Sequence, residues 1–340
     1  MRIVIVKTSS LGDVVHMLPA LSDAARCRQE LGVDWVVEEG FSAIPRWHPR
    51  VDRVIPIALR RWRKAWRCRQ TWQEIHAFRT QLRQRSYAAI IDSQGLYKSA
   101  LLASWTQGPR WGYDWQSARE PLAAWVYHHT VRVPWDLHAI ERNRRLLAAA
   151  LDYRHEALPL DYGVMPMRAQ LPRQGDRPHP SYVVGLHGTS RVEKEWPEPH
   201  WRWLGRWLSA HGLGLVLPWG NTAERERAER ITRAVPSGYV LPKLDLDALA
   251  AVLIRAVAVV GVDTGLMHVA AAWGCPGLAL YSVTDPARTG IIGALPAAPI
   301  YVLAGAEALS TEAVGRRLQQ LFEKVRVRGN LNIQAKIGLF

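Results

Sequence analysis

Short, continuously apolar segments of four to six residues recur along this chain, and helix-like patterns separate most of them. Strands that are apolar on both faces are typical of a parallel sheet covered by helices, because a strand with one wet face alternates instead. The patterns at 16–31, 70–85 and 96–105 predict helices. The apolar segments predict strands at residues 3–6, 33–37, 53–57, 88–91, 182–186, 214–217, 257–262, 278–281 and 300–303. The chain is therefore predicted to have an α/β fold with parallel sheets.

The alternation stops once, near the middle of the chain. Residues 159–180 hold five prolines among polar residues, a composition typical of an interdomain linker. A chain of 340 residues also suits two domains of about 150 residues better than one core. We therefore predict an N-terminal domain over 1–165, a C-terminal domain over 181–326 and a tail of unassigned order over 327–340.

The charge balance favours an anionic partner. A formal net charge of +14 leaves nucleic acid, anionic lipid and phosphorylated glycan open. Sixteen tryptophans against four phenylalanines suit sugar faces and membrane interfaces, although burial in a core is the commoner fate of tryptophan. No recognisable nucleic-acid-binding motif supports the first class, so we predict no nucleic acid partner.

Cysteine usage and hydropathy favour a cytoplasmic location. The three cysteines form no CxxC pair, which argues against a disulfide framework or a structural zinc site. The apolar run at 3–6 is too short for a signal peptide. The apolar segment 265–283 is interrupted by His268, Gly274 and Pro276, which predicts a helix and a strand in place of a membrane span. Any membrane contact is predicted to be peripheral.

The first predicted strand runs into the segment KTSSLGDVVH, residues 7–16. In a doubly wound sheet this is where a ligand crevice opens, and Gly12 permits a tight turn there. Asp13 either projects towards a ligand or caps the next helix, and the pattern leaves both readings open. The segment has neither Walker A nor GxGxxG spacing.

Three loops in the second half also follow predicted strands. Thr189, Ser190 and Lys194 can hold a diphosphate, or they can belong to a solvated loop. Glu224 can accept hydrogen bonds from a ribose diol, or serve as a first-turn helix acid. The third loop, residues 263–268, opens a helix whose unpaired amide groups suit phosphate oxygens, whereas Asp263 as a cap and His268 as a core residue are the alternatives.

A basic segment interleaved with tryptophan lies at residues 60–67. Charge runs are usually solvated, but Trp62 and Trp66 fit plain solvation poorly. We interpret the segment as an anion clamp at an interface. Its candidate binding residues are Arg60, Arg61, Arg63 and Lys64.

Several blocks in fixed order resemble the lipopolysaccharide heptosyltransferases I of glycosyltransferase family 9. They are VKTSSLGDVVHMLPAL, DWVVEEGF, RRWRKAW, IDSQGLYKSA, DWQSAREPLA, KEWPE, LPWGN and GVDTGLMHVAAA. The resemblance implies a GT-B fold of two facing Rossmann-like domains. It also implies inverting transfer of L-glycero-D-manno-heptose from ADP-heptose to the first Kdo of Kdo-lipid A. The acceptor would bind the N-terminal domain and the donor the C-terminal one, with the enzyme peripheral to the cytoplasmic face of the inner membrane.

The resemblance also assigns roles residue by residue. Asp13 matches the proposed general base, and Glu224 matches the ribose-binding acid. One departure is Ser190, which stands where a second threonine is expected and bears on donor preference. No DxD motif is present at a candidate metal position, so no essential metal is predicted. The remaining donor-binding positions are Thr189, Ser190, Lys194, Asp263, Thr264, Gly265, Leu266 and His268, and the acceptor-binding positions are Arg60, Arg61, Arg63 and Lys64.

Two alternatives remain open at this point. A non-catalytic nucleotide-sugar sensor of the same fold would keep the loops of the second half but would not need Asp13. Heptosyltransferase II shares the fold and attacks a heptose in place of Kdo. The basic segment and the block DWQSAREPLA favour heptosyltransferase I.

Overall fold

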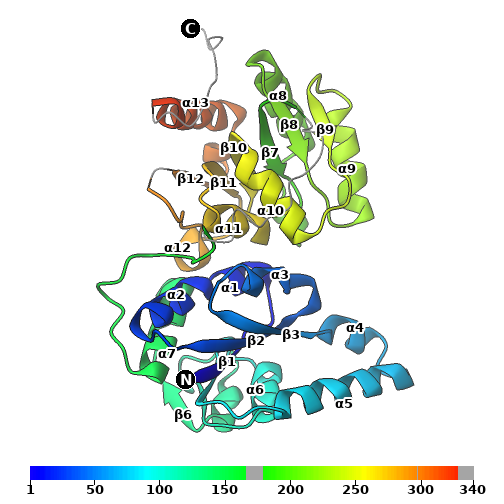
Figure 1. The fold of residues 1–340 in the computed structure, drawn as a ribbon. Coiled ribbons are helices and arrows are strands. Elements are labelled where there is room, and N and C mark those ends of the chain that lie inside the picture. The colour runs from blue at the N-terminus through cyan, green and yellow to red at the C-terminus, as the bar shows by residue number, and fades with distance from the viewer. Residues whose placement is uncertain (166–178, 297, 328–340) are drawn as a thin grey trace. The chain divides into compact units, whose positions relative to one another are not determined.

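The computed structural model describes residues 1–165, 179–296 and 298–327, and the chain divides into two compact units, Met1–Met167 and Arg168–Phe340 (Figure 1). Most of the predicted linker and nearly all of the predicted tail lie outside the described residues. Each unit contains one six-stranded parallel sheet. The predicted fold class of an α/β protein with parallel sheets is therefore confirmed.

The sheet of the first unit has the strand order β3-β2-β1-β4-β5-β6. Its strands are β1 (Arg2–Val6), β2 (Gly32–Glu38), β3 (Val51–Ile57), β4 (Ala89–Asp92), β5 (Arg110–Tyr113) and β6 (His129–Val131). Its helices are α1 (Leu11–Val15), α2 (Leu18–Cys27), α3 (Ala43–Arg46), α4 (Leu59–Lys64), α5 (Arg69–Arg83), α6 (Tyr97–Ser104) and α7 (Ala139–Leu151), with 3₁₀ turns η1 (Glu39–Phe41) and η2 (Pro121–Val126).

The sheet of the second unit has the order β12-β11-β10-β7-β8-β9. Its strands are β7 (Tyr182–Leu186), β8 (Gly214–Leu217), β9 (Gly238–Val240), β10 (Ala258–Val262), β11 (Gly277–Tyr281) and β12 (Ile300–Ala304). Its helices are α8 (Glu198–Ala210), α9 (Thr222–Thr232), α10 (Leu246–Arg255), α11 (Gly265–Ala272), α12 (Pro286–Thr289) and α13 (Thr311–Val327), with 3₁₀ turns η4 (Val192–Lys194) and η5 (Glu307–Leu309).

Both units have the doubly wound order of a dinucleotide-binding sheet when their strands are numbered from the first strand of each. All nine predicted strands are present, and the sequence reading missed β5, β6 and β9. These three strands are short, and each lies at a sheet edge or one strand from it. They therefore lack the continuous apolar run that marks a strand buried on both faces.

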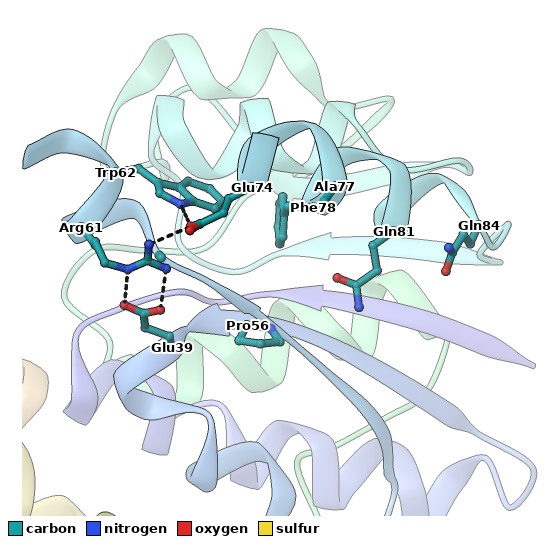
Figure 2. Close-up of a pocket in the computed structure, with 10 residues that line it drawn as sticks. Glu39, Pro56, Arg61, Trp62, Glu74, Ala77, Phe78, Gln81 and Gln84 are labelled. Atoms are coloured by element: carbon teal, nitrogen blue, oxygen red, sulfur yellow. Dashed lines mark hydrogen bonds and ion pairs between the residues drawn. The ribbon is translucent and has the colours of Figure 1, made fainter. Parts of the chain in front are cut away.

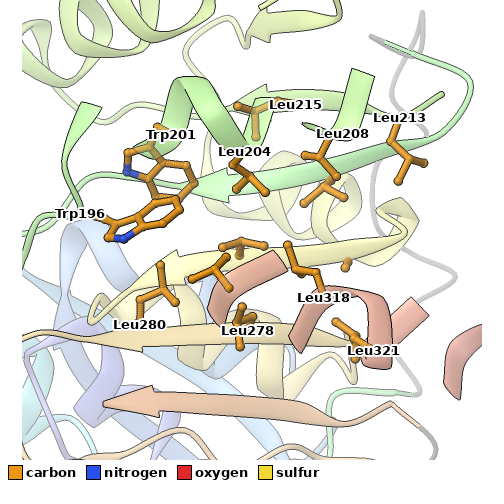
Figure 3. Packing of buried hydrophobic residues seen from close by; sticks show 14 of the residues in the cluster. Trp196, Trp201, Leu204, Leu208, Leu213, Leu215, Leu278, Leu280, Leu318 and Leu321 are labelled. Atoms are coloured by element: carbon orange, nitrogen blue, oxygen red, sulfur yellow. The ribbon is translucent and has the colours of Figure 1, made fainter. Parts of the chain in front are cut away.

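The second unit has a core that α8 and α13 cover on the same face of the sheet (Figure 3). Trp196 and Trp201 are almost fully buried there, with ring centroids 5.2 Å apart in an edge-to-face arrangement. Trp196 Nε1 donates to the carbonyl oxygen of Leu309 (2.8 Å), which satisfies the polar edge of the indole. Trp196 and Trp201 are two of six buried tryptophans among the sixteen of the chain, so part of the unusual tryptophan content is core.

The apolar segment 265–283 folds as predicted, into α11 followed by β11. Among the described residues, no helix is both long enough and apolar enough to span a bilayer.

Candidate functional site

In a doubly wound sheet, ligands bind outside the carboxyl ends of the strands where the strand order reverses. That switch point lies between β1 and β4 in the first unit and between β7 and β10 in the second. The loops that follow these four strands hold most of the predicted site residues.

The second unit brings three predicted donor residues together at its switch point. Lys194 Nζ lies 2.6 Å from Asp263 Oδ2, and Thr189 Oγ1 donates to the carbonyl oxygen of Asp263 (3.0 Å). The side chains of Lys194 and Asp263 are 17% and 14% exposed, so the pair can still be reached by a ligand. Ser190 is exposed beside them. This cluster places a cation and two hydroxyls where phosphate oxygens are expected.

Glu224 lies against the same loop from α9. Its carboxylate accepts from the backbone N–H of Gly220 (2.7 Å) and from Asn221 Nδ2 (2.9 Å). A Cβ at Gly188 would lie only 2.8 Å from Glu224 Cδ, so the loop backbone passes directly beside the carboxylate. Both sequence readings of Glu224 agree with this geometry, because it interacts within the first turn of α9 and also faces the loop of Thr189.

Arg227 is a residue of this site that the sequence reading missed. Its guanidinium is buried and donates to the carbonyl oxygens of His187 (2.9 Å) and Trp196 (2.7 Å), and it lies 3.0 Å from a carboxylate oxygen of Glu195. It therefore fixes both ends of the loop that carries Lys194. The one sequence feature that could have indicated this role is that Arg227 lies next to Ala228 and one turn before Ile231, two apolar residues of an otherwise polar helix.

Burial controls the protonation of His187, the first residue of that loop. Burial, and then the charge of Arg227, lower the pKa of His187 to about 4. Its Nε2 lies 3.1 Å from the carbonyl oxygen of Pro218, which fits a neutral ring that donates. His187 is therefore a structural residue at the loop base.

The predicted helix start also follows β10. Thr264 precedes α11, and its side chain makes no capping bond, so it does not occupy the amide groups of the first turn. Gly265 and Leu266 form that first turn, half-buried, and His268 is buried one turn further on. Burial, and then the negative charge of Asp263, raise the pKa of Tyr281, a buried residue at the end of β11.

In the first unit, Asp13 lies on α1 and is half-buried. Its Oδ2 accepts from both the backbone N–H (2.9 Å) and the hydroxyl (2.7 Å) of Ser10. No described residue donates to its Oδ1. The carboxylate thus completes a capping box and still presents one oxygen for other chemistry.

The switch point of the first unit also holds a cation, Lys7, which was not singled out from the sequence. Burial lowers the pKa of Lys7, while the negative charges of Asp13 and Asp92 oppose that shift. Its Nζ donates to the carbonyl oxygen of Ser93 (2.7 Å). Lys7 follows β1 directly and lies in the same sequence block as Asp13. This position is the sequence feature that could have identified Lys7 as a residue of the site.

The loop after β4 braces the loop after β1. Gln94 Oε1 accepts from both the backbone N–H and the hydroxyl of Thr8 (2.8 Å each). Beneath it, Asp92 is buried, with a pKa raised by that burial, and accepts from the hydroxyls of Tyr127 (2.7 Å) and Ser99 (2.8 Å). Asp92 therefore has partners throughout and supports the loop instead of serving as an open acid.

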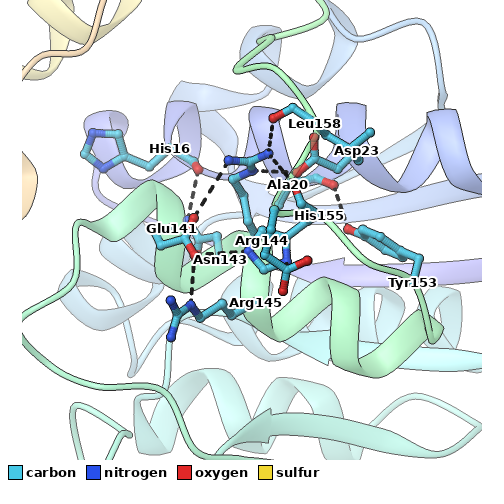
Figure 4. Close-up of polar contacts among 11 residues, drawn as sticks. His16, Ala20, Asp23, Glu141, Asn143, Arg144, Arg145, Tyr153, His155 and Leu158 are labelled. Carbon is cyan, nitrogen blue, oxygen red and sulfur yellow. Dashed lines mark hydrogen bonds and ion pairs between the residues drawn. The ribbon is translucent and has the colours of Figure 1, made fainter.

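Helix α7 supports α1 and α2 from outside the sheet (Figure 4). Asn143 Nδ2 donates to the carbonyl oxygen of His16 (3.0 Å), immediately after α1. Arg144 Nε donates to Asp23 Oδ2 (2.6 Å) of α2, and this contact opposes the raised pKa that burial gives Asp23. The polar contacts of α7 therefore fix the segment that holds Asp13.

The basic segment forms α4, beside a cavity of about 610 Å³ lined mainly by α4, α5 and β3 (Figure 2). Arg61 is paired there with Glu39 (3.2 Å) and Glu74 (2.7 Å). Trp62 is buried, with Nε1 donating to Glu74 (2.7 Å), so it is not an exposed member of the predicted interface. Hydrophobic packing of its ring against Phe78 explains the difference.

The other basic residues of this segment remain accessible. Arg60 lies over the ring of Phe41, 5.1 Å from its centroid, and Arg63 and Lys64 are exposed without an ion pair to any described residue. Trp66 is also exposed. The structure therefore separates the four predicted acceptor residues into Arg61, whose charge is already compensated, and three whose charges are available.

The family model for glycosyltransferase family 9 (heptosyltransferase) matches residues 75–333. Lipopolysaccharide heptosyltransferase 1 of Pseudomonas aeruginosa is 48% identical over 299 residues, which cover 86% of this chain and 82% of that protein. The chain belongs to glycosyltransferase family 9. As a member of this family it is a glycosyltransferase, a heptosyltransferase I of lipopolysaccharide core biosynthesis, which confirms the resemblance found in the sequence.

Solved structures support the same family. The E. coli heptosyltransferase WaaC with ADP superposes with a TM-score of 0.87 at 43% identity, covering 94% of this chain and 100% of that one. The same enzyme with ADP-2-deoxy-2-fluoro heptose gives 0.85 at 42% identity, covering 94% and 99%. The two Rossmann-like units of this heptosyltransferase are thus of the GT-B class, as predicted.

Proposed function

We propose that this heptosyltransferase moves L-glycero-D-manno-heptose from ADP-heptose to the first Kdo of Kdo-lipid A, with inversion at the anomeric carbon. The observation that carries the donor assignment is the cluster of Lys194, Asp263 and Thr189 at the β7/β10 switch point. A related enzyme supports the donor assignment, because E. coli WaaC has been solved with ADP and with a fluorinated ADP-heptose.

The donor site is assigned to the second unit. Negative charge accumulates on the diphosphate as the glycosidic bond breaks. The ammonium group of Lys194 and the backbone amide groups in the first turn of α11 stabilise that charge. Glu224 is assigned to the ribose hydroxyls, which its carboxylate can accept from. Thr189, Ser190, Thr264, Gly265, Leu266 and His268 are assigned to the remainder of the donor site.

The acceptor hydroxyl is assigned to Asp13 in the first unit. Asp13 Oδ1 takes the proton of the acceptor hydroxyl while the hydroxyl oxygen attacks the anomeric carbon from the face opposite ADP. The Ser10 contacts hold Oδ2 and so orient the carboxylate. The basic residues Arg60, Arg63 and Lys64 are assigned to acidic groups of the acceptor, with Arg61 as a paired neighbour. No essential metal is part of this proposal.

The proposed location is the cytoplasmic face of the inner membrane, with peripheral attachment. The net charge of +14 supports attraction to an anionic bilayer.

One assay tests the proposal directly. The purified chain is incubated with ADP-heptose and Kdo-lipid A, and the product is analysed by mass and by the configuration of the new linkage. We expect one heptose to be added to Kdo with inversion. Matched reactions replace the acceptor by one already carrying that heptose, and the donor by another ADP-sugar. Transfer only to the heptosylated acceptor would assign the chain to the second step of core synthesis instead.

A further inference from the structure

Helix α6 and the 3₁₀ turn η2 bury their alanines but leave several large apolar side chains exposed, although Leu102 of α6 is buried. In η2, Ala123 is buried against Ala100 and Tyr127, and Ala124 is also buried, whereas Leu122 and Trp125 are 52% and 77% exposed. A 3₁₀ turn places residues three apart on one face, so these two side chains share the outer side. Folding alone favours the reverse arrangement, because burial of the larger side chains stabilises a core more.

The neighbouring residues extend this apolar surface. Trp115 stacks on Trp125, with ring centroids 5.8 Å apart. In α6, Tyr97 and Leu101 are one turn apart and both exposed, and the backbone N–H of Tyr97 donates to Glu120 (2.6 Å), just before η2. We call the surface formed by Tyr97, Leu101, Trp115, Leu122 and Trp125 the aromatic patch. A contiguous exposed patch of this kind marks an interaction surface.

The chemistry of the aromatic patch selects its partner. Trp and Tyr combine a flat apolar body with a polar edge, which suits the boundary between headgroups and acyl chains. Two exposed cations border the aromatic patch, and neither forms an ion pair with another described residue. Lys98 follows Tyr97 on α6, and Arg132 follows Val131, whose carbonyl oxygen accepts from the backbone N–H of Asp114, the residue before Trp115. Apolar side chains bordered by unpaired cations match a bilayer surface that carries anionic lipid.

We infer that the aromatic patch is the membrane-docking surface of this enzyme, with Leu122 and Trp125 entering the headgroup boundary of an anionic bilayer. The inference rests on the proposed function in one respect, namely that the acceptor is lipid-linked and held in that bilayer. It assigns the membrane contact to α6 and η2, in place of the basic segment of α4. Arg60, Arg63 and Lys64 of α4 then serve the acceptor alone.

The test is cosedimentation of the full chain with vesicles, using Leu122→Ser with Trp125→Ser. Because both side chains are exposed, the thermal unfolding midpoint should not change. Binding to vesicles of phosphatidylglycerol and phosphatidylcholine should fall by about tenfold or more, the scale for losing one large apolar side chain from a boundary. The matched control is Trp66→Ser with Trp72→Ser, which should change binding by less than about twofold. These two tryptophans are 57% and 59% exposed, and they lie between α4 and α5 and in α5.

Two further measurements complete the test. Lys98→Gln with Arg132→Gln should weaken binding to the anionic vesicles and leave the weak binding to pure phosphatidylcholine unchanged. With a water-soluble, acyl-free acceptor, the Leu122/Trp125 variant should keep the parental KM and kcat, and it should lose activity only towards acceptor held in vesicles.

Three outcomes would overturn the inference. They are parental vesicle binding by the Leu122/Trp125 variant, a larger loss in the Trp66/Trp72 control, and a raised KM for the acyl-free acceptor, which would make the aromatic patch a sugar-binding surface. Failure of the proposed function is distinguishable, because it would appear as absence of heptose transfer by the parent chain, whereas vesicle binding is measured without turnover.

Discussion

The two units have one strand order but differ in what happens to charge at the switch point. In the first unit, Lys7 and Asp92 are buried, and their polar atoms are held by neighbouring backbone and hydroxyl groups. In the second unit, Lys194 and Asp263 pair with each other at a partly open position. Shared topology therefore does not define a shared ligand. The burial of the charged side chains decides which of them a ligand can reach.

The largest expected effect comes from Asp13→Asn in the first unit. Asparagine can still accept both bonds from Ser10, so the fold and ADP affinity should be unchanged. Because it cannot take a proton, kcat should fall by about 100-fold to 10,000-fold. Steady-state kinetics with a matched thermal unfolding scan check this. Turnover within a few-fold of the parent would leave Asp13 as a helix cap only.

Acid should destabilise both units through one buried histidine in each. Burial lowers the pKa of His48 and His187 to about 4, whereas an unfolded histidine titrates near 6.5. Below about pH 6.5 the unfolded chain therefore binds protons that the folded chain does not, and stability falls as the pH drops towards 4. Each histidine lowers the free energy of unfolding by about 3 kcal/mol between pH 6.5 and pH 4.

Denaturant unfolding of His187→Asn at several pH values checks that effect. The variant should lose less stability than the parent between about pH 6.5 and pH 4. The matched control is His128→Asn, an exposed histidine, which should follow the parent. An unchanged pH dependence in the His187 variant would mean that this ring is not kept neutral by burial.

The next effect separates the two switch points by ligand. Lys194→Ala should weaken ADP binding by roughly tenfold to 100-fold, the scale for one charge-assisted contact to phosphate. Lys324→Ala, an exposed lysine of α13, is the control and should bind ADP like the parent. Calorimetry measures both. Unchanged ADP affinity in the Lys194 variant would exclude it from the diphosphate site.

The smallest effect concerns the basic segment. Arg63→Ala with Lys64→Ala should raise the acceptor KM by several-fold to about tenfold, and it should make activity less sensitive to salt because two screened contacts are lost. The donor KM should not change. Arg61→Ala is the comparison, since Glu39 and Glu74 already compensate its charge and its acceptor KM should rise less. A rise in the donor KM alone would assign the segment to the nucleotide side.

The sequence predicted the buried centre of each sheet better than its edges. Continuous apolar runs mark β1, β4, β7 and β10, and hence the loops at both switch points, because only buried parallel strands read this way. The short strands β5, β6 and β9 carry no such signal. Motif reasoning also selected Thr189, Lys194 and Asp263 as candidates, and the structure shows that the three are in contact.

Partners supplied by other helices and loops could not be read from the sequence. Arg227 lies on a helix of mainly charged residues, and only the packing of α9 reveals that it faces inward. Arg61 and Trp62 looked like members of a surface clamp, yet their partner Glu74 is a residue of the next helix. Local composition determines neither which face of a helix packs against the rest of the protein nor which charged residue its side chains contact.

The contacts of Arg227 have a consequence for the entropy of ligand binding. One guanidinium donates to the carbonyl oxygens of His187 and Trp196, so the intervening loop is tied at both ends before any nucleotide arrives. The conformational freedom of that loop is largely removed during folding instead of during binding. A preorganised loop of this kind loses less entropy when it closes on a diphosphate, so more of the contact energy remains as affinity.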